Sequence, residues 1–218
     1  MFTEQIDTLR CPNPHAQSWL VATSTRTVGR HIMAGRLGCP ECRASFEIVD
    51  GEVLFAAGAT LRTTRTLDSD AAFRLAAQLH LVEAPQPILL TGSWSRAVAP
   101  LRELVPTVTM FVGDGTSTIT LDERVSSLRL PSSAIPLATG ALRAVALDAQ
   151  HASAELLAES ARVLRTAGRL VAPASVTLDA LLWRTLATDA DLVVAERLPV
   201  ASAPVKLKRA PAAPLFEA

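Results

Sequence analysis

The sequence lacks any apolar run of the roughly 18 to 20 residues that a membrane-spanning helix requires. It also lacks an excess of either charge, because its 218 residues include 21 basic and 21 acidic side chains. Proteins that bind nucleic acid through a basic surface usually carry a clear positive excess. The first ten residues contain acids and no apolar stretch typical of a signal peptide. We therefore expect a cytoplasmic protein with neither membrane insertion nor a nucleic-acid partner.

Lysine is scarce as well, since only Lys206 and Lys208 are present among the basic residues. Both lie in a C-terminal stretch whose end is rich in proline and alanine, a composition typical of an irregular tail. By contrast, 49% of the residues are hydrophobic, which is ample for a folded core. Composition and motifs together predict four parts: a small module over 1–58, a linker and helix over 59–86, an α/β domain over 87–209 and a tail over 210–218.

Cysteine occurs three times, always within the first 42 residues. An odd number argues against a disulfide framework, and the clustering indicates a metal instead. Structural zinc takes four sulfur or nitrogen ligands, usually as two close pairs. Cys39 and Cys42 form one pair in a tight Cys-Pro-Glu-Cys turn, and Cys11 with His15 supplies the other. His31 also lies between the pairs, and spacing alone leaves it open as a replacement for His15.

Residues 45–55 follow this motif and read as a β-hairpin, because Asp50-Gly51 is a strong two-residue turn signal. Such a small unit buries little surface by itself, so we expect the metal to supply much of its folding energy. The stretches Leu-Arg-Cys-Pro at 9–12, Cys-Pro-Glu-Cys at 39–42 and Phe-Glu-Ile-Val-Asp-Gly at 46–51 resemble a zinc-ribbon family. Members of that family activate methyltransferases or precede ribosomal RNA guanine methyltransferases. Five arginines and six acidic residues over 1–55 argue against a phosphate-gripping role here.

The remainder alternates strand-like and helix-like segments, which predicts an α/β fold with a mostly parallel sheet covered on both faces. A mostly apolar helix is expected over 70–83 and an amphipathic helix over 154–166, with a further helix over 178–186. The expected strands cover 87–91, 107–112, 125–130, 143–147, 169–172, 192–195 and 205–207.

Three stretches of this part resemble class I S-adenosylmethionine-dependent methyltransferases. They are Leu-Arg-Leu-Pro at 128–131, Gly-Ala-Leu-Arg-Ala-Val at 140–145, and the helix and strand over 156–171 with a Thr-Ala-Gly turn. The resemblance implies a Rossmann-like methyltransferase sheet over about 87–209 and S-adenosylmethionine as the cofactor. The expected fold class is therefore a Rossmann-like methyltransferase sheet preceded by a small zinc-ribbon β module.

The loop at 91–97 argues against cofactor binding. Methyltransferases of this class use several glycines there, because the cofactor's amino-acid end must reach backbone N–H groups. This chain has Gly92 alone, followed by Ser93 and Trp94. If the cofactor binds, the resemblance places it on Gly92, Ser93 and Asp114, the last at the ribose hydroxyls. The acid expected beside the third strand is replaced by Ser126.

Two further features have two readings each. Trp94 either stacks on an adenine-like ligand or fills the space that a cofactor would occupy, and the missing glycines favour filling. Asp148 and His151 follow the fourth strand, where such enzymes often place catalytic groups. An acid at that position is also a common helix cap.

The sequence favours a zinc-binding, methyltransferase-like protein with a degenerate cofactor loop. We expect it to act as a non-catalytic accessory that binds another protein subunit. One rival is an active S-adenosylmethionine-dependent methyltransferase acting on RNA, protein or a small molecule. Another is a regulatory module that binds a different nucleotide or metabolite.

Overall fold

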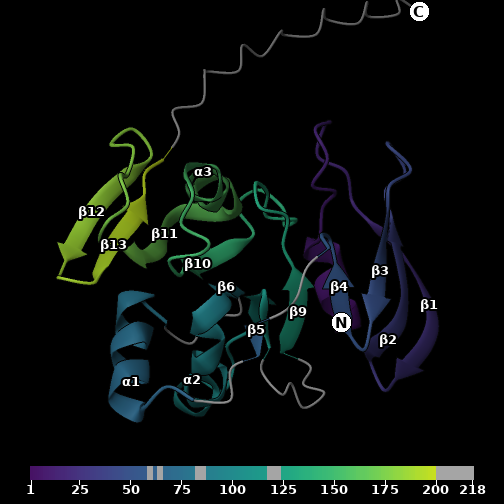
Figure 1. Cartoon of the computed structure of the whole chain (residues 1–218), viewed down its shortest axis with the longest axis horizontal. Coiled ribbons are helices and arrows are strands. Elements are labelled where there is room, and N and C mark those ends of the chain that lie inside the picture. The colour runs from purple at the N-terminus through teal and green to yellow at the C-terminus, as the bar shows by residue number, and fades with distance from the viewer. Residues whose placement is uncertain (58–60, 63–65, 82–86, 117–123, 200–218) are drawn as a thin grey trace, which may run out of the picture.

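The computed structural model describes residues 1–57, 61–62, 66–81, 87–116 and 124–199. Eleven strands of these residues form one sheet in the spatial order β1-β2-β3-β4-β9-β7-β6-β10-β11-β13-β12 (Figure 1). The predicted strand over 205–207, both lysines and the predicted tail lie outside the described residues. Among the described helices, none is both long and apolar enough to cross a membrane.

The strands of this sheet have the following bounds: β1 Val21–Val28, β2 His31–Gly38, β3 Ser45–Val49, β4 Glu52–Leu54, β6 Ile88–Thr91, β7 Met110–Gly113, β9 Val125–Arg129, β10 Leu142–Ala146, β11 Leu164–Pro173, β12 Trp183–Thr188 and β13 Leu192–Arg197. Two short strands pair separately, β5 Leu61–Arg62 and β8 Gly115–Thr116. The helices are η1 Thr3–Thr8, α1 Ser69–Gln78, η2 Gly92–Ala97, α2 Val98–Leu104 and α3 Ala154–Val163.

The centre of the sheet is parallel, as the buried apolar runs predict. β6 pairs in parallel with β7 on one side and β10 on the other, and every residue of these three strands is buried. Strands buried on both faces need apolar side chains throughout, which explains runs such as Ile88-Leu89-Leu90. Strand order reverses between β6 and β10, and sheets of this kind bind ligands at the carboxyl ends of the strands beside such a reversal.

Alternate residues of β6 face two different cores. Ile88 and Leu90 pack in the cluster that contains buried residues of α1 and α2, so these helices cover one face. Leu89 packs in the cluster that contains α3 residues and the N-terminal module, which together cover the other face (Figure 1). Side-chain caps define the starts of two helices: Asp68 accepts the Ala71 N–H, and Ser153 accepts the Leu156 N–H.

The N-terminal module is joined to the larger sheet through both backbone and core. Its last strand, β4, pairs in parallel with β9, and the Phe55 N–H donates to the Arg129 carbonyl at 3.0 Å. Leu9 forms an isolated bridge with Leu137, and both are fully buried in one shared cluster. Buried Ser126, where the cofactor acid was expected, accepts the Phe2 N–H instead.

The hairpin prediction is confirmed, because β3 and β4 pair across Asp50 and Gly51, which have φ values of 48° and 85°. The prediction of a helix over 178–186 is wrong. Residues 183–188 form β12, which pairs with β13 across a turn where Asp189 accepts the N–H groups of Asp191 and Leu192. The helix predicted over 70–83 is shorter and buries only one face, since Phe73 is 66% exposed.

Candidate metal site and strand-end crevice

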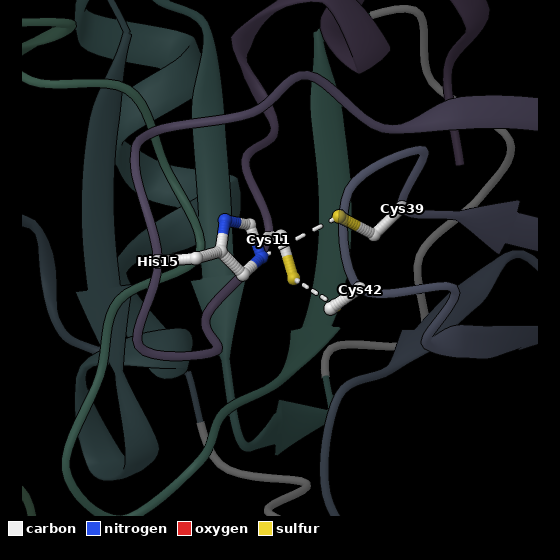
Figure 2. Close-up of side chains that lie close together, drawn as sticks. All are labelled: Cys11, His15, Cys39 and Cys42. Atoms are coloured by element: carbon white, nitrogen blue, oxygen red, sulfur yellow. Dashed lines mark hydrogen bonds between the residues drawn. The ribbon is translucent and has the colours of Figure 1, made fainter.

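Cys11, His15, Cys39 and Cys42 lie together at one end of the N-terminal module (Figure 2). Their ligand atoms all lie within 4.8 Å of one another. The Sγ atoms of Cys11 and Cys42 are 3.6 Å apart, and Cys39 Sγ is 3.5 Å from His15 Nε2. Sequence spacing had proposed these four residues, and the fold brings all four together.

Two tight turns hold the ligand pairs. The N–H of Arg43 donates to the carbonyl of Cys39, and the N–H of Cys39 donates to the carbonyl of Ala44. Arg43 adopts a φ of 60° to close this turn. On the other side the N–H of Cys11 donates to the carbonyl of Ser18. The long segment between the pairs forms the β1–β2 hairpin, which the sequence reasoning treated as an undefined gap.

The cluster has the dimensions of a zinc site. A tetrahedral zinc ion with Zn–S bonds of about 2.3 Å and Zn–N bonds of about 2.0 to 2.1 Å places two sulfurs about 3.8 Å apart and a sulfur and a nitrogen about 3.5 Å apart. The Cys11–Cys42 and Cys39–His15 distances of 3.6 and 3.5 Å are close to these values. His15 Nδ1 lies 2.7 Å from the Ala16 carbonyl, which fixes the proton on Nδ1 and leaves Nε2 as a ligand. The Cys3His group can therefore bind zinc.

The thiols of the cluster differ in pKa. A backbone hydrogen bond from Ala44 and the side-chain amide of Asn13 lower the pKa of Cys42 to about 6. Burial raises the pKa of Cys11 to about 12. Because metals bind the thiolate, Cys42 is poised for ligation at neutral pH, whereas Cys11 must lose its proton as the metal enters.

His31, the alternative ligand, lies elsewhere. It begins β2, is 6% exposed, and its ring centroid is 5.4 Å from that of Phe2. The structure therefore brings His15, and not His31, to the three cysteines.

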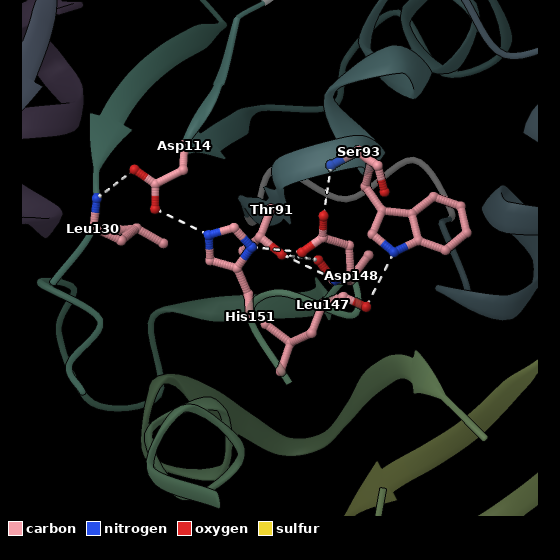
Figure 3. A network of polar contacts seen from close by, with 9 residues as sticks. Thr91, Ser93, Asp114, Leu130, Leu147, Asp148 and His151 are labelled. Atoms are coloured by element: carbon pink, nitrogen blue, oxygen red, sulfur yellow. Dashed lines mark hydrogen bonds and ion pairs between the residues drawn. The ribbon is translucent and has the colours of Figure 1, made fainter. Parts of the chain in front are cut away.

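The second candidate site lies at the carboxyl ends of β6, β7 and β10 (Figure 3). There the carboxylate of Asp148 lies directly against Gly92. Asp148 Oδ2 accepts the Ser93 N–H at 2.8 Å, and a Cβ added to Gly92 would lie 2.2 Å from the same oxygen. Gly92 has a φ of +46°, so it serves both a left-handed turn and this close approach. A side chain of the protein thus occupies the space in front of the loop's glycine.

His151 connects this carboxylate to Asp114 at the end of β7. Its Nδ1 lies 2.5 Å from Asp148 Oδ1, and its Nε2 lies 3.0 Å from Asp114 Oδ2. Asp114 also accepts the Leu130 N–H at 3.1 Å, which ties in the end of β9. The imidazole therefore links the loop after β10 to Asp114 after β7, Asp114 extends the link to the end of β9, and Asp148 extends it to the loop after β6.

Charge favours this arrangement. Burial alone would lower the pKa of His151, but the contacts with Asp114 and Asp148 outweigh it and raise the pKa to about 9. Burial alone would raise the pKa of Asp148, but hydrogen bonds from His151 and Ser93 hold it below its usual value. The ring is therefore an imidazolium at neutral pH, and both of its N–H groups donate. Asp148 is not the side-chain cap of α3, because Ser153 accepts the Leu156 N–H there. A catalytic role for Asp148 and His151 stays a hypothesis.

Trp94 occupies the other side of the loop. Its indole Nε1–H donates to the Leu147 carbonyl at 3.1 Å, and the partly buried ring packs against the α1–α2 core cluster. The Leu147 carbonyl, which follows the last residue of β10, therefore already accepts a hydrogen bond from the indole.

A cavity of about 410 Å³ lies on the far side of His151. It opens to solvent between the N-terminal module and the ends of β7, β9 and β10. Its lining includes Ala57, Asp114, Leu130, Gln150 and His151, but no residue of the 91–97 loop. The three residues predicted to bind a cofactor are thus divided: Asp114 faces the cavity, whereas Gly92 and Ser93 contact Asp148. The sequence had drawn attention to Asp148 and His151 separately, but only the fold shows that they bridge to Asp114.

Comparison with known proteins gives similarity of fold. No family model and no curated protein matches the chain. Among solved structures it is similar to geranyl diphosphate C-methyltransferase from Streptomyces coelicolor A3(2), at 17% identity and a TM-score of 0.41 over 49% of this chain and 43% of that one. It is also similar to the MycE methyltransferase of the mycinamycin biosynthetic pathway, at 11% identity and a TM-score of 0.46 over 62% and 49%.

A third match is a complex between the Haloferax volcanii Trm112 methyltransferase activator and the putative methyltransferase, at 18% identity and a TM-score of 0.36 over 48% of this chain and 54% of that one. The chain thus spans about half the length of these three structures. It has a mixed α/β fold with parallel core strands, similar to class I S-adenosylmethionine-dependent methyltransferases, preceded by β-hairpins beside a Cys3His cluster.

Proposed function

We propose that this chain is a zinc-stabilised, methyltransferase-like accessory subunit that does not bind S-adenosylmethionine and that contacts another protein. The observation that carries this proposal is the Asp148 carboxylate on the Ser93 N–H, in the space in front of Gly92. A cofactor whose amino-acid end needs that N–H would have to displace a partly buried, charge-assisted hydrogen bond. Asp114, the residue proposed for the ribose hydroxyls, is likewise held by His151 and Leu130.

Zinc has a structural role in this proposal. All four ligand positions are filled by protein side chains, which is the arrangement of a structural site rather than of a catalytic one with an open position. The ligand turns flank the β1–β2 hairpin and η1, which pack on the β9 side of the sheet. Zinc bound there would stabilise the edge of the whole sheet.

The partner is proposed to be protein. The surface ion pairs Arg26–Asp50 and Arg36–Glu47 neutralise charge on the outer strands of the module, which leaves little positive field for phosphates. Exposed Trp19 and Val21, at 56% and 61%, are the type of side chain enriched in protein interfaces. We expect no RNA binding at physiological salt in a filter-binding assay. Submicromolar binding that weakens steeply with salt would contradict this assignment.

Isothermal titration of the zinc-loaded protein with S-adenosylmethionine and S-adenosylhomocysteine tests the proposal. We expect no saturable heat with either compound. The rival is an active methyltransferase, which the cavity beside Asp114 and His151 favours, because about 410 Å³ lies within the range of ligand pockets. Saturable binding together with transfer of a labelled methyl group would establish the rival.

A further inference from the structure

A short set of contacts holds Asp148 at the start of the 91–97 loop. Its carboxylate accepts the Ser93 N–H, its own N–H donates to Thr91 Oγ1 at 3.1 Å, and His151 ties the carboxylate to Asp114. On one side of this ring lies the space in front of Gly92, and on the other lies the 410 Å³ cavity. The Asp148 carboxylate and the imidazole therefore lie between Gly92 and the cavity.

We propose that the loop over 148–151 is an autoinhibitory element, in which the Asp148 carboxylate occupies the place of a ligand carboxylate and His151 is the positioning residue that holds it there. This inference rests on the proposed function, because it explains why the site is closed. It goes further than the proposed function, because it states that the residues of the site can still bind a ligand once the contact from Asp148 is removed.

Three observations support a blocked site. Gly92 keeps a backbone conformation that leaves room for an approaching group, with a φ of +46° and no Cβ. The group that approaches is a carboxylate, and its contact with Ser93 is 2.8 Å long, a normal distance for a charge-assisted hydrogen bond. Displacing the 148–151 loop would also free Asp114 Oδ2, which is bonded to His151 Nε2, and Asp114 already lines the cavity. The opened site would therefore offer a backbone N–H for a carboxylate and an acidic acceptor for hydroxyl groups.

The chemical class that fits the opened site is a nucleoside that carries an α-amino acid, with S-adenosylhomocysteine as the probe. In the closed state such a ligand must compete with Asp148, which lowers its apparent affinity by the fraction of molecules that are open. A hydrogen bond to a charged group commonly shifts such an equilibrium by about 10- to 100-fold.

The test compares wild type with Asp148→Ala, His151→Ala and the nearby control Glu155→Gln. Glu155 is exposed in the first turn of α3 and does not line the cavity. Titration with S-adenosylhomocysteine is expected to show saturable binding by the first two variants, at least about tenfold tighter than the weakest affinity that the wild-type titration excludes, and no saturable binding by the control. Folded Asp148→Ala protein that binds no more tightly than wild type overturns the proposal.

Hydrogen exchange of the Ser93 amide tests the positioning role separately. In His151→Ala the carboxylate is still present, so faster exchange at Ser93 would show that the ring holds it in place. Unchanged exchange overturns that role. If either single variant unfolds, the double variant Asp148→Ala/His151→Ala replaces it, since it removes the ring together with one of the carboxylates that the ring neutralises. The same tenfold criterion then applies.

The two proposals fail in different ways. Saturable binding by wild type contradicts the accessory-subunit proposal, yet the autoinhibition proposal still stands if Asp148→Ala binds tenfold more tightly. If neither wild type nor any variant binds S-adenosylhomocysteine, the accessory-subunit proposal stands and the autoinhibition proposal is overturned.

Discussion

Replacing Gly92 by alanine is the substitution that the crevice geometry constrains most. The added Cβ would lie 2.2 Å from Asp148 Oδ2 and 2.7 Å from its Cγ, so the carboxylate must move. A left-handed conformation costs a non-glycine residue about 1 to 2 kcal/mol. Displacing the carboxylate from Ser93 adds about 1.5 to 3 kcal/mol for a hydrogen bond to a charged group. The expected loss of unfolding free energy is therefore about 2.5 to 5 kcal/mol.

Gly140→Ala is the matched control. Gly140 has a φ of +67°, but a Cβ there would have nothing within 4 Å, so only the backbone cost of about 1 to 2 kcal/mol applies. Urea unfolding followed by circular dichroism measures both variants. In a chain of this size, the difference in unfolding free energy between Gly92→Ala and Gly140→Ala corresponds to a difference of about 3 to 12 °C in melting temperature. Equal destabilisation of the two variants would refute the claim that Asp148 fills the space in front of Gly92. The double variant Gly92→Ala/Asp148→Ala should cost less than the sum of its parts, because the clash is gone.

Three other expectations concern the metal, the pH and the indole. Purified protein should contain about one zinc per chain by atomic absorption, Cys42→Ser should lose it, and His31→Ala should keep it. The stabilisation that protonated His151 gives should be fully present below the pKa of an unfolded-state histidine, about 6.5, and should be lost as pH rises through about 9. Urea denaturation at pH 7 and pH 10 should show this loss of unfolding free energy. The loss should be smaller in His151→Gln. Trp94→Gly should cost about 2 to 4 kcal/mol in urea, below the cost for a fully buried ring, without creating methyltransferase activity.

The sequence predicted the metal cluster well because spacing within short turns limits where ligands can go. Cys39 and Cys42 are confined to one turn, and Pro12 and Pro14 restrict the loop that carries Cys11 and His15. The Asp50-Gly51 hairpin was predictable for the same reason, since few dipeptides accept two positive φ values. These predictions rest on local geometry.

The predictions that failed depend on tertiary contacts. The apolar residues over 178–186 fit a helical pattern, but residues 183–188 pair with β13, and that pairing decides their conformation. The attachment of β4 to β9 could not be read from either strand, because each has an ordinary composition for a strand. The Asp114–His151–Asp148 network joins residues 34 and 37 positions apart that meet only where β7 and β10 end. No local pattern encodes such a meeting.

The central claim is that the protein's own Asp148 occupies the Ser93 N–H that a cofactor would use, while Trp94 in the same loop stays bonded to Leu147. The most direct measurement is a proton–nitrogen correlation spectrum with and without millimolar S-adenosylhomocysteine, in which Trp94→Phe identifies the Trp94 indole signal among the three tryptophans. We predict that the Trp94 Nε1–H and Ser93 amide signals do not move, because both donors stay bonded to the Leu147 carbonyl and to Asp148. Saturable movement of both signals along a single binding curve would contradict the account.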